Sequence, residues 1–205
     1  GKPLWRKAVG TKVVTAPLVA GERVFVLGVD RRIVAFDVLD GRKLWAQQRP
    51  GEPLTLAQGG VLAPFKNTLL VGQGQRLAGI DPLKGSVRWE VAIANPRGTN
   101  EVERVADLVG PAARSGDVVC ARAFQSAVGC ANAQTGTLLW TKNTGGAQAI
   151  GADAELVASA DGSGRITAWR AATGDLAWTA EQLLHRDLSG MLVVGRTVIV
   201  GDFEG

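Results

Sequence analysis

This 205-residue sequence has one histidine, two cysteines and no recognisable catalytic motif. The single histidine, His185, and the absence of any Cys-x-x-Cys spacing argue against a metal site. There is no Gly-x-Ser-x-Gly, phosphate-binding loop or motif-bound carboxylate pair, and no run approaches the ~18 apolar residues of a membrane-spanning helix. We therefore expect no catalytic, cofactor-binding or metal-binding residue in this chain.

The chain also has only a small excess of positive charge. The formal net charge is +4 and the isoelectric point is near 9.4. Lysine and arginine are scattered over predicted turns and strand ends and do not gather with aromatic residues, so we expect no nucleic-acid partner. A solvated positive surface explains this charge, and weak attraction to acidic partners or lipid headgroups is the alternative.

What the chain does contain is a repeat, a glycine followed four residues later by tryptophan. The Trp-to-Trp intervals are 40, 44, 51 and 38 residues, close to the ~40–45-residue period of propeller blades. The four full copies and one partial copy at the start are Gly41–Trp45, Gly85–Trp89, Gly136–Trp140, Gly174–Trp178 and Lys2–Trp5.

Each repeat divides into short β-branched or aromatic runs separated by turn signals, which predicts a four-stranded antiparallel blade. The runs of the first unit are Val13–Leu18, Arg23–Leu27, Ile33–Asp37 and Lys43–Trp45. We predict an all-β propeller, residues 1–205 being a single fragment of an incomplete ring from an eight-bladed parent, with exposed strand edges. The expected whole blades are residues 12–48, 57–93, 105–142 and 147–180, and the partial blades are residues 1–8 and 188–205.

The repeated residues have structural roles in this prediction. We expect the repeat tryptophans to pack between blades, and Trp169, at the place of Phe36, to be core. The residue four positions before each repeat glycine can cap the turn in the first three units but not in the fourth. These residues are Asp37, Asp81, Asn132 and Arg170, so the fourth turn should be held differently.

Cys120 and Cys130 flank a predicted hairpin turn. They correspond to Phe25 and Ala35 of the first unit and are candidates for directly opposed positions. Opposed residues of a non-hydrogen-bonded pair have Cβ atoms near the separation that a disulfide needs. In an oxidising compartment the two would be bridged, and in the cytosol they would be two small buried apolar residues.

The Gly-x-x-x-Trp repeats with a preceding Val-Ala-Phe-Asp-like strand resemble the repeats named after pyrroloquinoline quinone. Those repeats occur in quinoprotein dehydrogenases and in a periplasmic lipoprotein family. Two segments are more specific, because Glu181–Arg186 with its following strands and the insertion Arg97–Asp107 resemble the BamB family. That family consists of propeller subunits of the outer-membrane β-barrel assembly machinery.

The resemblance implies a non-catalytic scaffold without a cofactor, at the periplasmic face of the outer membrane. It implies binding to the periplasmic domains of BamA, with unfolded outer-membrane proteins as a further partner. Membrane contact would be only through a lipid anchor absent from this chain. The alternative is a fragment of a periplasmic quinone-dependent dehydrogenase, which would need a calcium site and a cofactor cradle on the ring axis.

The resemblance also implies partner-binding residues on two loops. A Leu-x-Leu-Arg form is placed at Leu54 and Leu56; its arginine is not reproduced, and Ala57 and Gln58 follow. An Asp-x-Asp form that follows an acidic-Arg pair is placed at Glu103, Arg104 and Asp107, and Val109 stands where the second aspartate would be. The residue types alone leave both roles open. The leucines could be first-strand core of the second blade rather than an apolar anchor, and Arg104 and Asp107 could pair with each other rather than form a charged rim.

Overall fold

In the computed structural model, residues 1–50, 54–95 and 99–204 are described, and every regular element among them is a β-strand. Four sheets have four antiparallel strands each, in chain order, and a fifth has two. The first two sheets contain β1 (Leu18–Ala20), β2 (Arg23–Leu27), β3 (Arg32–Asp37), β4 (Lys43–Gln48), β5 (Leu62–Phe65), β6 (Thr68–Gln73), β7 (Arg76–Ile80) and β8 (Val87–Ala92).

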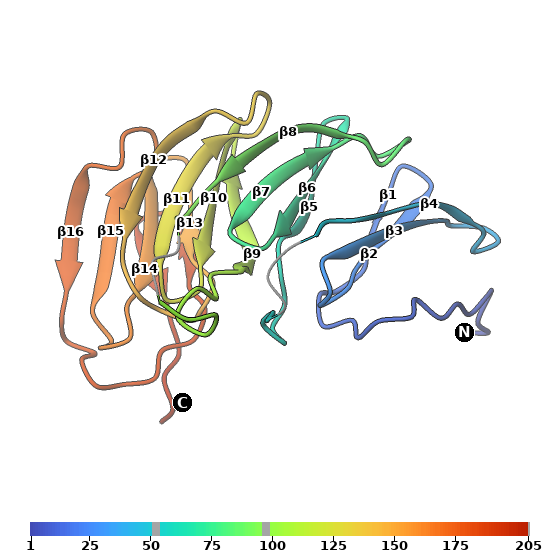
Figure 1. The fold of residues 1–205 in the computed structure, drawn as a ribbon. Helices are drawn as coiled ribbons and strands as arrows, with labels where there is room; N and C mark the ends of the chain where they lie inside the picture. Colours follow the sequence, from blue (N-terminus) through green and yellow to red (C-terminus); the bar gives the residue numbers. More distant parts are fainter. Residues whose placement is uncertain (51–53, 96–98, 205) are drawn as a thin grey trace.

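The remaining sheets follow the same plan. They contain β9 (Leu108–Ser115), β10 (Val118–Ala123), β11 (Ala127–Asn132), β12 (Leu138–Asn143), β13 (Gly151–Ala152), β14 (Leu156–Ala160), β15 (Ile166–Arg170), β16 (Leu176–Ala180), β17 (Leu192–Val194) and β18 (Thr197–Ile199). The sheets stand side by side in an arc (Figure 1). The first strands contact one another, β1 with β5, β5 with β9 and β9 with β13, so they form the inner side of the arc. This arrangement of antiparallel blades confirms the predicted propeller architecture.

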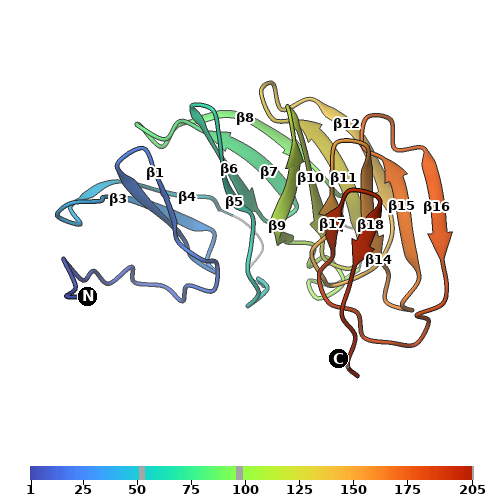
Figure 2. The ribbon, with the colours of Figure 1, turned by 180° about the vertical axis from the view of Figure 1, so that it is seen from behind.

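The two-stranded sheet β17–β18 continues the arc. Its strand β17 contacts β13 of the fourth sheet, and Figure 2 shows both strands beside that sheet. Residues 1–8 form no strand at the other end of the arc.

Because the strands are antiparallel, the arc has two ends that carry different turns and links. At one, the hairpin end, each sheet turns from its first to its second strand and from its third to its fourth. At the other, the connection end, lie the second-to-third turns and the links between successive sheets. These two names are used below.

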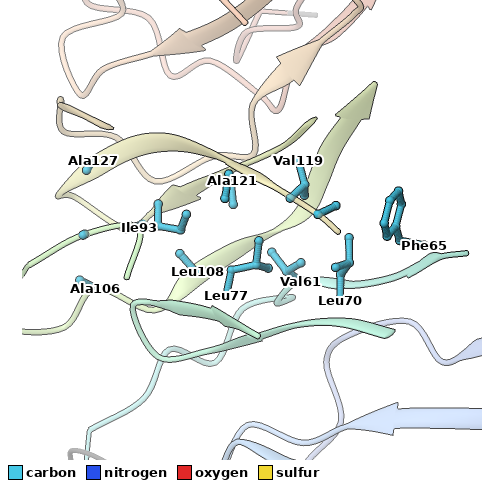
Figure 3. Close-up of a cluster of buried hydrophobic side chains, with 14 residues drawn as sticks. Val61, Phe65, Leu70, Leu77, Ile93, Ala106, Leu108, Val119, Ala121 and Ala127 are labelled. Carbon is cyan, nitrogen blue, oxygen red and sulfur yellow. The ribbon is translucent and has the colours of Figure 1, made fainter. Parts of the chain in front are cut away.

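Apolar side chains fill the spaces between sheets. The largest cluster joins the second and third sheets, and Leu70 and Leu77 of one pack with Val119 and Ala121 of the other (Figure 3). All four side chains are fully buried. A sheet with one face uncovered would expose this surface, so each sheet depends on its neighbour for a core.

Four of the five repeat tryptophans lie on the repeat glycine of the next sheet. An added Cβ at Gly41, Gly85, Gly136 or Gly174 would come within 2.6–2.7 Å of the ring of Trp5, Trp45, Trp89 or Trp140, respectively. These glycines also have φ of +67° to +74°, which other residues rarely adopt. The position therefore requires glycine for two separate reasons, and the predicted packing of these tryptophans between blades is confirmed.

Further contacts fix the rings. The indole nitrogens of Trp5, Trp45 and Trp140 donate to the carbonyls of Val38, Pro82 and Ala171 in the next sheet, at 2.8–3.0 Å. Trp140 also packs on Trp169 with ring centroids 6.3 Å apart, as Trp5 packs on Phe36 at 6.2 Å. Trp169 is thus the core residue that its match with Phe36 predicted. Trp178 packs in the last cluster, with Leu188 and Met191.

The turns before the repeat glycines share one backbone pattern. The amide of each glycine donates to the carbonyl four residues earlier, including Gly174 to Arg170 at 2.8 Å. The side chains of Asp37, Asp81 and Asn132 accept backbone amides of their turns. In the fourth turn the Thr173 hydroxyl and the Asp175 carboxylate bond instead, at 2.7 Å, so the predicted difference lies in the side chains.

The predicted first strand, Val13–Leu18, is wrong in position, because β1 begins only at Leu18. Pro17 has no amide hydrogen for a strand ladder. The preceding residues bond elsewhere: the Thr15 hydroxyl accepts the Gly60 amide at 2.9 Å, and the Lys12 carbonyl accepts the Val29 amide at 3.0 Å. Residues 12–15 therefore line the inner side of the arc without joining a sheet.

Cys120 and Cys130 are directly opposed in the β10–β11 register, as predicted, with Cα atoms 4.0 Å apart. Their sulfur atoms are bonded in the structure. Phe25 and Ala35 are opposed in the same way in the first sheet. The disulfide thus replaces a buried apolar contact at an equivalent place.

We predict that Gly136→Ala lowers the free energy of unfolding by about 3 kcal/mol, because a methyl group would combine backbone strain with overlap on Trp89. Gly116→Ala is the matched control, since φ is +54° there and an added Cβ meets nothing within 4 Å. It should cost only about 1 kcal/mol. Urea denaturation measures both, and equal losses would contradict a specific role of the ring contact.

We predict that Cys120 and Cys130 are oxidised in protein exported to an oxidising compartment. Denatured protein should then react with maleimide only after reduction, as read by mass spectrometry. Reduction should lower the free energy of unfolding by about 3 kcal/mol, because the bridge restricts the unfolded chain between two cysteines that are 10 residues apart. Two free thiols in exported protein would refute the bridge.

Candidate functional site

The connection end carries a polar clasp formed by Arg31, Leu54, Leu56 and Asp107. Arg31 Nη2 donates to Asp107 Oδ1 at 2.9 Å and to the Leu54 carbonyl at 3.3 Å. The Leu56 amide donates to Asp107 Oδ2 at 2.8 Å. Both ends of the segment 54–56 are therefore held by one ion pair, which joins the first sheet to the link before the third.

The clasp is largely shielded from water. The side chains of Arg31 and Asp107 are 12% and 16% exposed, respectively. Low exposure strengthens such a charge-assisted pair and makes loss of one partner costly. Leu54, in contrast, is 40% exposed and Leu56 is half-buried. The clasp thus holds the backbone of this segment while Leu54 faces solvent.

Neither leucine belongs to the second sheet, because β5 begins at Leu62. The interpretation of these leucines as first-strand core is therefore wrong. The link before them includes residues 51–53, which lie outside the described residues. Hydrogen bonds formed across the arc, rather than a strand ladder, hold the two leucines in place.

A further bond extends the clasp toward the fourth sheet. Gln58 Nε2 donates to the Ala147 carbonyl at 3.0 Å, across 89 residues of sequence. Arg104 is half-buried at the end of the turn over residues 101–104, three residues before Asp107. Within the clasp, the carboxylate of Asp107 binds Arg31 and Leu56. The insertion that contains Arg104 and Asp107 begins at residues 97–98, which lie outside the described ranges.

Arg31 and Arg122 also bind other segments at this end, and the sequence analysis selected neither of them. Arg31 occupies a second-to-third turn with φ +62°. Arg122 is fully buried and donates to the carbonyls of Thr144, Gly145 and Ala160 at 2.7–3.2 Å. A turn signal of the form Asp-Arg-Arg and a charged residue within an apolar strand are the only hints, and neither identifies a partner.

Burial lowers the pKa of Arg122 without removing its charge at neutral pH. Desolvation lowers the pKa of its guanidinium to about 10, and the negative charge of Asp161 acts in the opposite direction. The group remains charged at neutral pH and binds backbone carbonyls instead of a carboxylate. It therefore holds the link 144–146, which leads directly to the Ala147 carbonyl that Gln58 reaches.

Within residues 1–50, 54–95 and 99–204, no cluster of three histidine, cysteine, aspartate or glutamate side chains could hold a metal ion. Over the same ranges, no helix is long and apolar enough to span a membrane.

Comparison with known sequences gives a consistent match. The family model described as "Outer membrane protein assembly factor BamB" matches residues 1–180. The curated proteins of that name from Bordetella pertussis and Burkholderia pseudomallei are 31% and 30% identical over the whole chain. The chain spans 54% of the length of each, so about half of these relatives has a counterpart here.

Solved structures agree in fold. The crystal structure of BamB from Moraxella catarrhalis superposes with a TM-score of 0.87, at 20% identity, over 96% of this chain and 60% of that one. A quinohemoprotein alcohol dehydrogenase from Pseudomonas putida reaches 0.67 at 16% identity, over 96% of this chain and 39% of its own. At such identities both likenesses concern the fold alone.

We predict that Asp107→Ala lowers the free energy of unfolding by about 3 kcal/mol, because it leaves the shielded Arg31 without its carboxylate. Hydrogen exchange of the Leu56 amide should also become at least tenfold faster. Asp117→Ala is the control, since its ion pair with Lys66 is about half exposed and should contribute under about 1 kcal/mol. Unchanged exchange at Leu56 would show that Asp107 does not hold the segment.

Proposed function

From the premise that this chain belongs to the BamB family of outer membrane protein assembly factors, we propose that it is a non-catalytic scaffold binding the periplasmic domains of BamA. The observation that carries this proposal is the clasp, which holds segment 54–56 at both ends and leaves Leu54 exposed. A fixed apolar side chain among polar groups is the usual centre of a small protein interface. Little conformational entropy would then be lost on binding.

The residues placed on the two loops have different parts in this proposal. Leu54 is the apolar contact, and Gln58 and Arg104 supply polar surroundings. Asp107 acts mainly as a positioning residue, because both of its carboxylate oxygens are engaged within the clasp. The arginine that the family form would place after the second leucine is absent, and Arg31 supplies a cation from another turn.

The setting follows from the same family membership. We place the scaffold at the periplasmic face of the outer membrane, where it would assist the folding and insertion of β-barrel proteins. We propose unfolded outer-membrane proteins as a further partner in this role. The likeness to quinone-dependent dehydrogenases concerns the fold, and no residue in the described part of the chain favours that second function.

We predict that Leu54→Asp weakens binding to the periplasmic domains of BamA at least tenfold, or about 1.4 kcal/mol, because a charge would be desolvated in an apolar contact. Leu56→Asp is a poorer probe, since it would place a second carboxylate beside Asp107 and open the clasp. Calorimetry with purified domains measures the affinity.

Leu83→Asp is the matched control for this experiment. Leu83 is 61% exposed but lies at the hairpin end, so the same change there should leave BamA binding as in the wild type. Circular dichroism checks that both variants fold. A folded Leu54→Asp protein with unaltered affinity would refute the proposed surface.

A further inference from the structure

An open cavity of about 320 Å³ lies between the first and second sheets at the hairpin end. This volume is within the range of small ligand sites, roughly 300–1,000 Å³. Its lining is mainly apolar, with buried Phe25 and Leu69 among the residues at its base. The other apolar lining residues are Ala20, Pro64, Pro82 and the exposed Leu83.

The next space along the arc shows what such a cavity can hold. Phe65 ends β5 opposite Thr68, as Ala20 ends β1 opposite Arg23. The two residues are therefore equivalent in neighbouring sheets. The Phe65 ring is buried between the second and third sheets and packs in the cluster with Val119 (Figure 3).

The walls of the two spaces correspond as well. Leu69 is paired with Pro64 in the second sheet, and Val119 is paired with Arg114 at the same register in the third. The ring of Phe65 thus occupies, one sheet further on, the place where Ala20 leaves an open cavity. A methyl group is too small to fill the space that a benzyl group fills. The equivalent position is Ser115 in the third sheet and Asp153, one residue past β13, in the fourth. Among the four-stranded sheets of the described chain, only the second therefore has an aromatic residue at this position, which is Phe65.

Cations surround both spaces. Lys66 Nζ lies 4.9 Å, and Arg114 Cζ 5.5 Å, from the centroid of the Phe65 ring. The open cavity is lined by Arg23, Lys66 and Arg88. Cations close to an aromatic face interact favourably with it. The cavity therefore offers an aromatic group the same kind of environment as Phe65 has.

Arg23 gives the cavity a preference for negative charge. Lys66 pairs with Asp117, and Arg88 pairs with Asp81, at 3.0 and 2.8 Å. Arg23 makes no ion pair within the described part of the chain, and its Nη1 donates only to the Gly21 carbonyl. Its Nε is buried and has no acceptor among the described residues. A carboxylate at the cavity mouth would give the guanidinium of Arg23 the ion-pair partner that it lacks among the described residues.

We propose that this cavity is a docking site for an aromatic side chain carried by an acidic peptide segment of a partner protein. The ring would enter between the first and second sheets, and flanking carboxylates would bind Arg23. This site lies at the opposite end of the arc from Leu54. It is therefore independent of the BamA-binding surface proposed above.

Fluorescence anisotropy with labelled acetyl-Glu-Glu-Phe-Glu-Glu-amide tests this proposal. Replacement of the phenylalanine by alanine, or of the glutamates by lysines, should each weaken binding at least tenfold. Ala20→Phe should also weaken it tenfold, because its own ring closes the cavity, while thermal stability should not fall. Val19→Phe is the matched control, since Val19 is 63% exposed and a ring there leaves the cavity open.

Three variants separate the possible outcomes. Leu83→Asp places a carboxylate at the rim and should weaken peptide binding while leaving BamA binding intact, and Leu54→Asp should do the reverse. Arg23→Gln should weaken peptide binding and reduce its dependence on salt. Equal binding by wild type and Ala20→Phe, or by the phenylalanine and alanine peptides, would overturn the proposal. Binding of decanoate without binding of the peptide would also overturn it, because the cavity would then accept an acyl chain.

Discussion

The contact of a tryptophan ring with a glycine of the next sheet is the constraint on which this propeller depends. It fixes the distance and rotation between successive sheets, because the ring lies flat where a Cβ would otherwise be. It also explains why glycine and tryptophan recur together while the residues between them vary. Three of the rings add a hydrogen bond to the next sheet, and two add an aromatic contact, so the joint varies in detail around one geometry.

This dependence explains how much of the fold could be predicted from sequence. The repeat identified the sheets, the equivalent tryptophans and the opposed cysteines, because each follows from local spacing within one unit. The start of β1 could not be predicted in this way. Thr15 bonds to Gly60, which is 45 residues away, and that contact draws residues 12–15 out of the sheet.

The candidate site was less accessible to sequence analysis. Leu54, Leu56 and Asp107 were selected through resemblance to a family, and the structure brings them into one clasp. Arg31, which completes the clasp, could not be selected, because it belongs to a different repeat and binds a backbone carbonyl as well as a carboxylate. Arg122 binds carbonyls alone, and no side-chain pattern in a sequence records such partners.

The tryptophan joints also concentrate the packing between sheets at one end of the molecule. The repeat glycines are in turns at the hairpin end, so the order of the sheets is fixed mainly there. The connection end is held by polar ties such as the Arg31–Asp107 pair and the Gln58–Ala147 bond. Such ties can be exchanged without moving the sheets, because they add to an arrangement already set by packing. A propeller built in this way can vary its links while its repeat, and therefore its shape, stays constant.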